Sequence, residues 1–423
     1  MFKIAFAACF AAALGLGATA HAQTTDSTDE NAADSSTLEL TFEKALALAR
    51  QSSPAAVGAP LRIREAEAAR IDASIYPRYN PLLEVELGPR LVGENLESAA
   101  FALGISQNLD LGGGVGARLR RVGAQVDAAH ADGDTAMQHT LRAVAHAFVR
   151  AQWAEQRMAL AADVRAIATS VHQATKKRVD AGDATPLELN VSRGGLARAA
   201  AEAKGAEATR EATYGEIRAL LGLSPTTQLV LQGKLETPRP LDVPALRKAS
   251  LNRGDVRALA ADLAAAQADQ DLADALAAPQ LSIGARYEFE DNQQHTILGT
   301  LSMTLPFFDH AQGLGAQAEA KAKRATTELA AKKREVSAQL DTAVRVTGKR
   351  VEASAAFSLE QGSQSFADNV KLAMRGYEAG ETSLGEVLLV RRELIDTEAD
   401  RLDRLLEVRS AEIELLHTAG MLR

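Results

Sequence analysis

The amino-acid sequence predicts a mostly helical chain with a small β part, built from two copies of one unit. Three features indicate this fold. A residue pattern recurs at a constant spacing, four short segments alternate between apolar and polar residues, and long stretches contain no proline. Aromatic residues make up only 4% of the 423 residues and alanine is abundant. We therefore do not expect a conventional globular core filled by large side chains.

Residues 1–22 have the features of a secretory signal peptide. A short positive start precedes an apolar run, and Ala20-His21-Ala22 supplies a small-x-small cleavage pattern. The run is too short to cross a bilayer, which needs about 20 apolar residues. Because the run contains Cys9, the only cysteine, we expect a mature chain that begins at Gln23 and has no thiol. Residues 23–37, rich in Asp, Ser and Thr, are expected to form a disordered linker.

An internal duplication relates the two halves of the chain. Arg178 to Glu188 and Gly376 to Glu386 share an Ala-Gly turn pattern, at an offset of 376 − 178 = 198 residues. The same offset relates Pro81 to Pro279. We expect two repeats with the same order of elements: a helical stretch, a strand pair and a long helical hairpin. The first repeat is predicted at residues 38–225, a linker at 226–240 and the second repeat at 241–423. The opening helical stretches are expected over 41–75 and 243–277. The hairpin tips are expected near 180–186 and 378–384.

The strand pairs are expected at residues 82–92 with 99–109 and at residues 281–289 with 296–307. Each segment alternates with period two, which predicts a strand with one apolar and one polar face. A soluble sheet packed on a core gives the same alternation. If the sheet lies in a membrane, four strands are too few to close a barrel, so several chains must share one. The residues expected to face lipid are Leu83, Val85, Phe101, Leu103, Leu281, Ile283, Tyr287, Leu301 and Met303.

The long tracts predict coiled-coil helices. No proline interrupts the sequence from Gly114 to Arg178. Leu388, Ile395 and Leu402 recur every seven residues, which is typical of helices that pack along one another. Gly182 and Gly380 lie in the predicted tips, where a turn needs a residue that accepts a positive φ.

The sequence contains little that indicates catalysis. There is no His-x-x-x-His, Gly-x-Ser-x-Gly or phosphate-binding pattern, and His139 and His146 form a lone pair on a helical tract. We expect no enzyme activity, no cofactor and no metal site. The formal charge is −8 and no basic stretch favours nucleic acid, so we expect no nucleic-acid partner. A periplasmic coiled-coil adaptor or scaffold is an alternative, but it would not explain two matched strand pairs.

Three motifs resemble one known family. Arg178-x-x-Ala-Gly-x-x-x-x-x-Glu188 and Tyr377-x-Ala-Gly-x-x-x-x-x-Glu386 resemble the hairpin tips of TolC-like outer-membrane efflux proteins. The segment Ser106 to Arg118 resembles the strand exit of that family, and Leu220 to Pro225 resembles the end of its first repeat. The resemblance covers Leu38 to Arg423 and is greatest to the CzcC-like heavy-metal branch.

This resemblance implies an outer-membrane channel with a large periplasmic part. The family fold is a homotrimer in which each chain adds four strands to a shared 12-stranded β-barrel and its helices to a coiled-coil α-barrel. The expected partners are outer-membrane lipid, a periplasmic adaptor (membrane fusion protein) and an inner-membrane pump of the RND type. The expected cargo is small solutes, heavy-metal cations above all, with multidrug efflux and type I protein secretion as alternatives.

The resemblance also implies functional positions at the tips. Glu188, Tyr377, Thr382 and Glu386 occupy the zone where the family narrows its duct and docks its adaptor. Family members can have arginine where Thr382 stands and an acid where Leu389 stands. The resemblance therefore implies a single carboxylate ring here, from Glu386. A different interpretation of Glu188 and Glu386 is that acids in the first turn of a helix favour its dipole.

Overall fold

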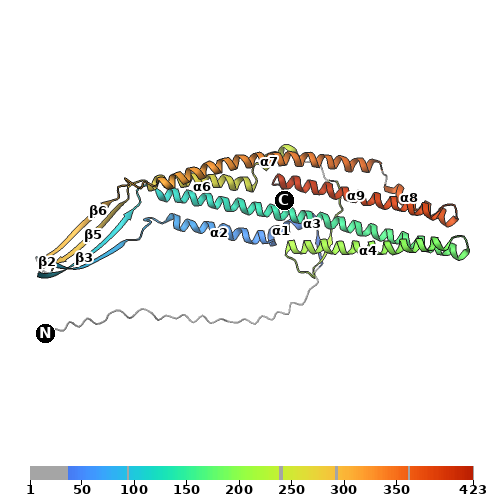
Figure 1. The fold of residues 1–423 in the computed structure, drawn as a ribbon, viewed down its shortest axis with the longest axis horizontal. Coiled ribbons are helices and arrows are strands. Elements are labelled where there is room, and N and C mark those ends of the chain that lie inside the picture. Colours follow the sequence, from blue (N-terminus) through green and yellow to red (C-terminus); the bar gives the residue numbers. More distant parts are fainter. Residues whose placement is uncertain (1–36, 93–94, 238–241, 291–293, 361–362, 423) are drawn as a thin grey trace, which may run out of the picture.

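The chain forms a long, narrow molecule, with a sheet at one end and the turns of two helical hairpins at the other (Figure 1). The structure is a computed structural model that describes residues 37–92, 95–237, 242–290, 294–360 and 363–422. The predicted signal peptide therefore lies outside the described residues, as does the predicted linker apart from Thr37.

The two halves of the chain fold into similar series of elements, except that three helices instead of two follow the strand pair of the second half. Alanine and other strong helix formers favour the long helices, and the longest spans 68 residues, about 100 Å. The first half consists of α1 (Phe42–Ser52), α2 (Pro54–Ser74), β2 (Leu82–Val92), β3 (Asn95–Leu109), α3 (Gly114–Ala181) and α4 (Pro186–Leu221). The second consists of α5 (Val243–Ser250), α6 (Gly254–Leu276), β5 (Leu281–Glu290), β6 (Gln294–Met303), α7 (Gln312–Glu360), α8 (Ser363–Ala379) and α9 (Leu384–Thr418).

Each opening helical stretch is two helices rather than the single one expected over 41–75 and 243–277. Ser53 ends α1 in an extended conformation and caps α2, accepting a hydrogen bond from the Ala56 N–H at 3.2 Å. Pro54 follows it, and the residue before a proline is driven out of the helical region. In the second repeat, the break lies at residues 251–253, between α5 and α6.

The predicted linker over 226–240 contains a strand. A second strand begins at Thr37, the last residue of the predicted linker over 23–37. These strands, β1 (Thr37–Leu40) and β4 (Gln228–Leu231), pair in parallel. Leu40 and Leu229 are buried in the main core. The correction has a physical reason: the alternation along Gln228–Leu231 lets the strand place Leu229 and Leu231 against the helices while Gln228 and Val230 stay exposed.

The main core lies at mid-length, where α1, α3, α4 and α9 meet (Figure 1). Its largest fully buried side chains include Phe148, Tyr214 and Ile413. The Tyr214 hydroxyl donates a hydrogen bond to Glu155. The pKa of Tyr214 is raised, mainly by burial and to a smaller extent by this hydrogen bond. Outside this region the interhelical contacts are made largely by alanine and valine.

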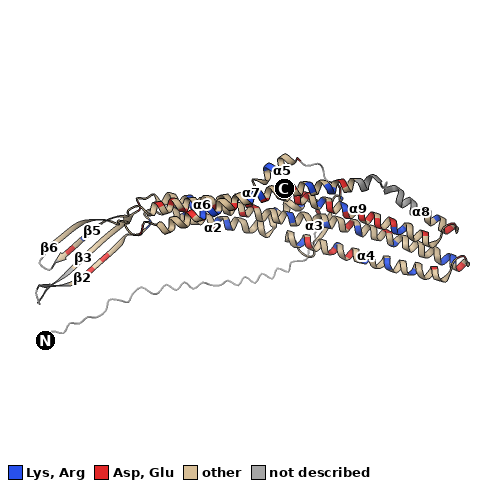
Figure 2. Cartoon of the chain, turned by 45° about the horizontal axis from the view of Figure 1, so that its top comes forward, with Lys and Arg blue, Asp and Glu red and all other residues tan. Residues whose placement is uncertain are grey.

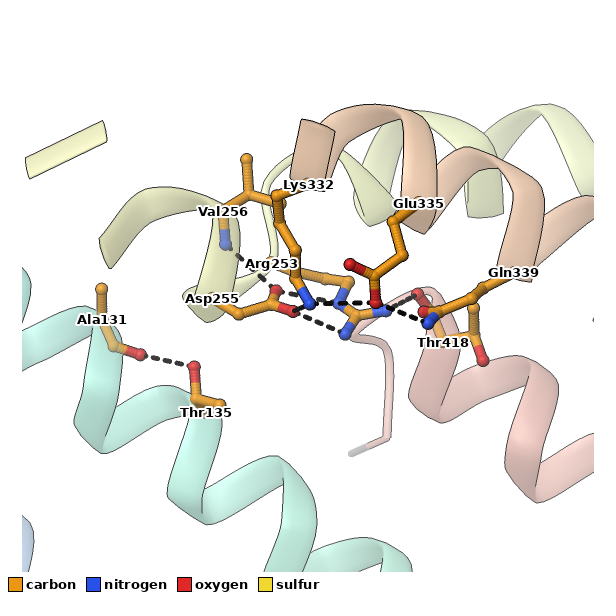
Figure 3. A network of polar contacts seen from close by, with 9 residues as sticks. All are labelled: Ala131, Thr135, Arg253, Asp255, Val256, Lys332, Glu335, Gln339 and Thr418. Atoms are coloured by element: carbon orange, nitrogen blue, oxygen red, sulfur yellow. Dashed lines mark hydrogen bonds and ion pairs between the residues drawn. The ribbon is translucent and has the colours of Figure 1, made fainter. Parts of the chain in front are cut away.

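A polar network fixes the second repeat at mid-length (Figure 3). Arg253 donates to the Thr418 carbonyl at the end of α9, at 3.1 Å, and to Asp255 at 2.8 Å. Lys332 of α7 lies 3.3 Å from Asp255. Burial raises the pKa of Asp255, but the hydrogen bonds and charges of Arg253 and Lys332 outweigh it and leave the pKa below its ordinary value. The network ties the start of α6 to α7 and α9.

The four long strands form one antiparallel sheet in the order β2-β3-β5-β6. β2 spans Leu82–Val92. β3 begins at Asn95 instead of residue 99, β5 ends at Glu290, and β6 spans Gln294–Met303 instead of 296–307. The early end of β6 precedes Pro306, which has no N–H for a strand ladder.

The sheet has two chemically different faces. Its register places the nine residues that were expected to face lipid on one side, together with residues such as Leu87 and Ile297. These side chains are largely exposed in the single chain; Leu301 and Ile297, for example, are 73% and 79% exposed. The opposite side carries Glu84, Glu86, Arg286, Glu288 and Thr300.

Candidate functional site

Both hairpin tips turn on a glycine in the left-handed region. Gly182 has φ 84° and Gly380 has φ 80°. In each tip the residue after the glycine donates to a carbonyl five residues back: Asp183 to Arg178 at 2.8 Å, and Glu381 to Gly376 at 2.8 Å. This is the C-terminal glycine motif that closes helices, and side chains with a Cβ adopt such a φ at a cost.

The two predicted gate glutamates both belong to capping boxes. Glu188 accepts from the Thr185 N–H at 2.7 Å, and the Thr185 hydroxyl accepts from the Glu188 N–H at 3.2 Å. Glu386 and Ser383 repeat this arrangement at 2.8 and 3.3 Å. Hydrogen bonds from the Ser383 backbone and hydroxyl hold the pKa of Glu386 below its ordinary value. Within one chain, each carboxylate stabilises the start of its own helix.

Tyr377 joins the tips of the two repeats. It is fully buried, and its hydroxyl lies 2.9 Å from the Thr175 Oγ1. Because Thr175 donates to the Val171 carbonyl, the Tyr377 hydroxyl is the donor. Arg178 lies over the Tyr377 ring, 4.6 Å from its centroid, and donates to the Tyr377 carbonyl at 3.1 Å. A small apolar cluster that includes Val171, Leu384 and neighbouring side chains surrounds this contact.

Thr382 has a different environment, within the second hairpin. A Cβ placed on Gly376 would lie 2.2 Å from the Thr382 Oγ1, so a side chain there would force the Thr382 hydroxyl to move. Nearby, a groove of about 920 Å³ lies between α8 and α9, with Leu372 and Leu389 on its walls. The four predicted gate residues thus have separate roles: two cap helices, Thr382 packs in its own turn, and Tyr377 reaches the other repeat.

Sequence reasoning missed Thr175, Arg178 and the capping hydroxyls of Thr185 and Ser383 as parts of this site. The capping boxes had a signal, since Thr or Ser stands three residues before each glutamate. Thr175 had none, because 202 residues separate it from Tyr377.

At the other end of the molecule, the polar face of the sheet carries a charged cluster. The Arg286 guanidinium donates to both Glu86 carboxylate oxygens, at 2.9 and 2.5 Å, and its Nε donates to Glu288 at 2.7 Å. Glu84 lies on the same face, opposite Gly104. Among the side chains described on this face, three carboxylates face one guanidinium, so the face has a net charge of 1 − 3 = −2 per chain.

The described part of the chain contains no group of three or more His, Cys, Asp or Glu residues arranged to hold a metal ion. Within the same residues, no helix is both long and apolar enough to span a membrane. Lys, Arg, Asp and Glu are spread along all the long helices (Figure 2).

A two-faced sheet at one end of a long helical bundle is the arrangement expected of a channel-forming protein. The chain belongs to the outer membrane efflux protein family, whose model matches residues 44–223 and 245–421, one match in each repeat. This confirms the predicted family. The chain is the outer-membrane channel component of a tripartite efflux system, with a large periplasmic part. Members of the family work with periplasmic adaptors and inner-membrane pumps.

Individual relatives agree with this assignment. The cobalt-zinc-cadmium resistance protein CzcC of Cupriavidus metallidurans is 28% identical over 370 residues, which cover 84% of each chain. The outer-membrane channel OprN is 21% identical with a TM-score of 0.71, covering 90% of this chain and 89% of that one. CusC, solved in connection with transmembrane channel formation, is 20% identical with a TM-score of 0.71, covering 90% and 92%. The structural matches confirm the predicted fold class.

Proposed function

We propose that three copies of this chain assemble into one duct that carries heavy-metal cations across the outer membrane. The four-stranded sheet ends in two edge strands, β2 and β6. Unpaired strand edges are not tolerated in lipid, so copies must pair edge to edge until the sheet closes. Three chains give 3 × 4 = 12 strands, which is within the range of known membrane barrels.

The charge of the polar face is the observation that favours cations. With the apolar side toward lipid, Glu84, Glu86, Arg286 and Glu288 line the passage, and three chains give 3 × −2 = −6 at this level. A confined wall of one sign concentrates ions of the opposite sign. The name of the CzcC relative adds cobalt, zinc and cadmium as the cations to test.

The tips are the proposed gate and the docking point for a periplasmic adaptor. Glu386, Glu188 and Thr382 lie at or beside the turns, and the buried Tyr377 holds the two hairpins together. Three copies of Glu386 would form one carboxylate ring at the narrow end. The proposed pump behind the adaptor is of the RND type, as the resemblance to the CzcC-like branch implies.

Growth of a deletion strain tests the cargo. The strain, with and without the gene on a plasmid, is grown across a series of cobalt, zinc and cadmium concentrations and across a panel of drugs. We expect sensitivity to the metals alone, restored by the plasmid. Sensitivity to drugs only would assign the duct to multidrug efflux, and loss of a secreted protein without metal sensitivity would assign it to type I secretion.

Native mass spectrometry in detergent tests the assembly separately. We expect a trimer, and a stable monomer or dimer would contradict the shared barrel.

A further inference from the structure

The apolar face of the sheet ends where the strands join the helical bundle. Strand β3 ends at Leu109, which pairs with Leu281, the first residue of β5. The segments that leave α2 and α6 come to the same level, beside the connection from β3 to α3 (Figure 1). With the apolar side of the sheet toward lipid and the bundle in the periplasm, this level is the periplasmic boundary of the membrane.

Aromatic side chains gather at this boundary. Tyr76 and Tyr79 follow α2 and are 56 and 48% exposed, and Phe307 and Phe308 follow β6 and are 76 and 94% exposed. Such residues are enriched where a membrane meets water. The Tyr79 carbonyl accepts a hydrogen bond at 2.7 Å from Gln107, which stands on the apolar side of β3. Tyr79 therefore lies toward the lipid side of the sheet.

A small cavity lies at the same boundary. Its volume is about 30 Å³, which is room for one water molecule or one phosphate oxygen. Three connecting segments line it: Arg78 and Tyr79 come from the segment after α2, Asp110 from the segment after β3 and Gln280 from the segment after α6. Arg118, in the second turn of α3, completes the lining.

Arg118 has a hydrogen-bond donor that the cavity leaves unused. Its side chain is only 10% exposed, with Nη1 3.5 Å from the Asp110 carboxylate and Nη2 donating to the Ile75 carbonyl at 3.4 Å. The Arg118 Nε is buried and has no hydrogen-bond partner among the described residues. A buried N–H without an acceptor is costly, so this site lacks one acceptor oxygen.

Arg78 supplies a second guanidinium, nearer to solvent. Its side chain is 41% exposed, and its Nη1 lies 3.9 Å from the carboxylate of Asp72, which is 76% exposed. An exposed pair at this distance contributes little, so Arg78 can bind another anion. Among the charged groups that line the cavity, two guanidinium groups face one carboxylate, Asp110, and the net charge is 2 − 1 = +1.

We propose that this cavity binds the phosphate of an anionic phospholipid in the periplasmic leaflet. One phosphate oxygen accepts from the Arg118 Nε–H, Arg78 binds the phosphate at the rim, and the acyl chains lie along the apolar side of the sheet. Arginine binds phosphate through charge-assisted hydrogen bonds, and basic residues beside a membrane attract anionic lipids. The inference rests on the proposed direction of the apolar face toward lipid and adds a lipid that the chain holds there.

Native mass spectrometry in detergent tests the site. Delipidated protein is titrated with phosphatidylglycerol, and the bound lipid is counted per chain. We expect one tightly bound lipid per chain. Arg78→Gln should weaken its binding about fivefold, the loss expected for one cation beside a lipid surface. Arg64→Gln, which removes an exposed arginine from the middle of α2, is the matched control and should leave the affinity unchanged. Equal affinities of the wild type and Arg78→Gln would overturn the inference.

Asp110→Asn should change the affinity in the opposite direction. Asparagine keeps the oxygen that accepts from the Gly112 N–H at 3.2 Å, but it removes the negative charge beside Arg118. Phosphatidylglycerol should therefore bind more tightly to this variant. An affinity equal to that of the wild type, or a lower one, would contradict a phosphate beside Arg118.

Two further titrations separate the lipid from free phosphate. Phosphatidylcholine, whose headgroup has no net charge, should bind less tightly than phosphatidylglycerol, and inorganic phosphate should not displace the lipid. Displacement by inorganic phosphate would assign the cavity to a free anion and overturn the lipid site. Because lipid is counted per chain, a monomer that retains it would reject the proposed trimer and keep the site. A trimer that binds both lipids equally would reject the site and keep the duct.

Discussion

Arg286 on β5 reaches across β3 to Glu86 on β2, and so one guanidinium links the two repeats on the polar face of the sheet. Both carboxylate oxygens are bound in the paired geometry that arginine favours. The side chain crosses at Gly104 and Ala102, the small residues of β3 that stand opposite Arg286 and Glu86. The contact therefore fixes both the position and the charge of the group that faces the proposed passage.

Arg286→Gln should increase the cation selectivity of the channel. The substitution removes the one described positive charge on this face, so its net charge goes from −2 to −3 per chain. Glu86→Gln should have the opposite effect. The reversal potential of single channels under a potassium chloride gradient in planar bilayers measures both. Ser282→Asn, a neutral change on the same face, is the control, and equal reversal potentials in all variants would show that the sheet does not set selectivity.

Glu386→Gln should weaken cation selectivity and block by a multivalent cation on the periplasmic side, while the trimer stays intact. Glutamine keeps the capping box because its side-chain oxygen accepts from Ser383, so only the charge is lost. Glu386→Ala removes the cap as well and should destabilise the start of α9. Single-channel recordings and native mass spectrometry separate the two effects. Unchanged block in the glutamine variant would mean that Glu386 is a helix cap alone.

Tyr377→Phe should loosen the connection between the hairpins. It removes one buried hydrogen bond, to Thr175, and such bonds contribute about 0.5–1.5 kcal/mol. The ring, its apolar contacts and the position of Arg178 over it remain. We expect faster amide hydrogen exchange in residues near both tips. The exchange rates around Tyr214, in the distant main core, should not change. Identical exchange at the tips would show that the hydroxyl contributes nothing to the contact.

Stability should fall as the pH falls from about 6.5 toward 4, because of His417. Burial, and then the charges of Arg142, His139 and Arg253, lower the pKa of His417 from 6.5 to about 4, against the opposing effect of Glu414. Below pH 6.5, His417 binds a proton in the unfolded chain but stays neutral in the folded chain. Its contribution to the free energy of unfolding is therefore present in full only above that pH. The loss is at most about 3 kcal/mol at low pH.

His417→Gln should flatten this part of the profile. Thermal unfolding between pH 7.5 and 4.5 compares it with the wild type and with His310→Gln, whose histidine is exposed. A profile for His417→Gln as steep as that of the wild type would assign the pH dependence to other groups.

Arginine at Leu301 should damage the membrane part far more than arginine at Thr300. Leu301 lies on the apolar face and Thr300 on the polar face of the same strand. A charged residue on the lipid side near mid-depth costs about 2–4 kcal/mol per site, whereas one toward water costs little. The yield of trimer from purified outer membranes measures the difference. Equal yields would contradict the assignment of the two faces.

The sequence by itself determined the duplication, the long helices, the two-faced strands and the tip turns. These features depend on local rules: glycine accepts the positive φ of Gly182 and Gly380, and period-two alternation separates Leu301 from Thr300. The family followed from the same local motifs. The capping boxes of Glu188 and Glu386 were also within reach, because the Ser or Thr and the Glu stand only three residues apart.

Only the tertiary structure decided which distant groups meet. Tyr377 contacts Thr175 and Arg286 contacts Glu86 because the two repeats pack side by side. No spacing in the sequence encodes that packing. The strand β4 inside the predicted linker forms because β1 lies beside it to receive its hydrogen bonds. A side chain's own sequence neighbourhood fixes its local conformation, but its partner and the shift of its pKa depend on the dielectric and the charges that the fold brings to it.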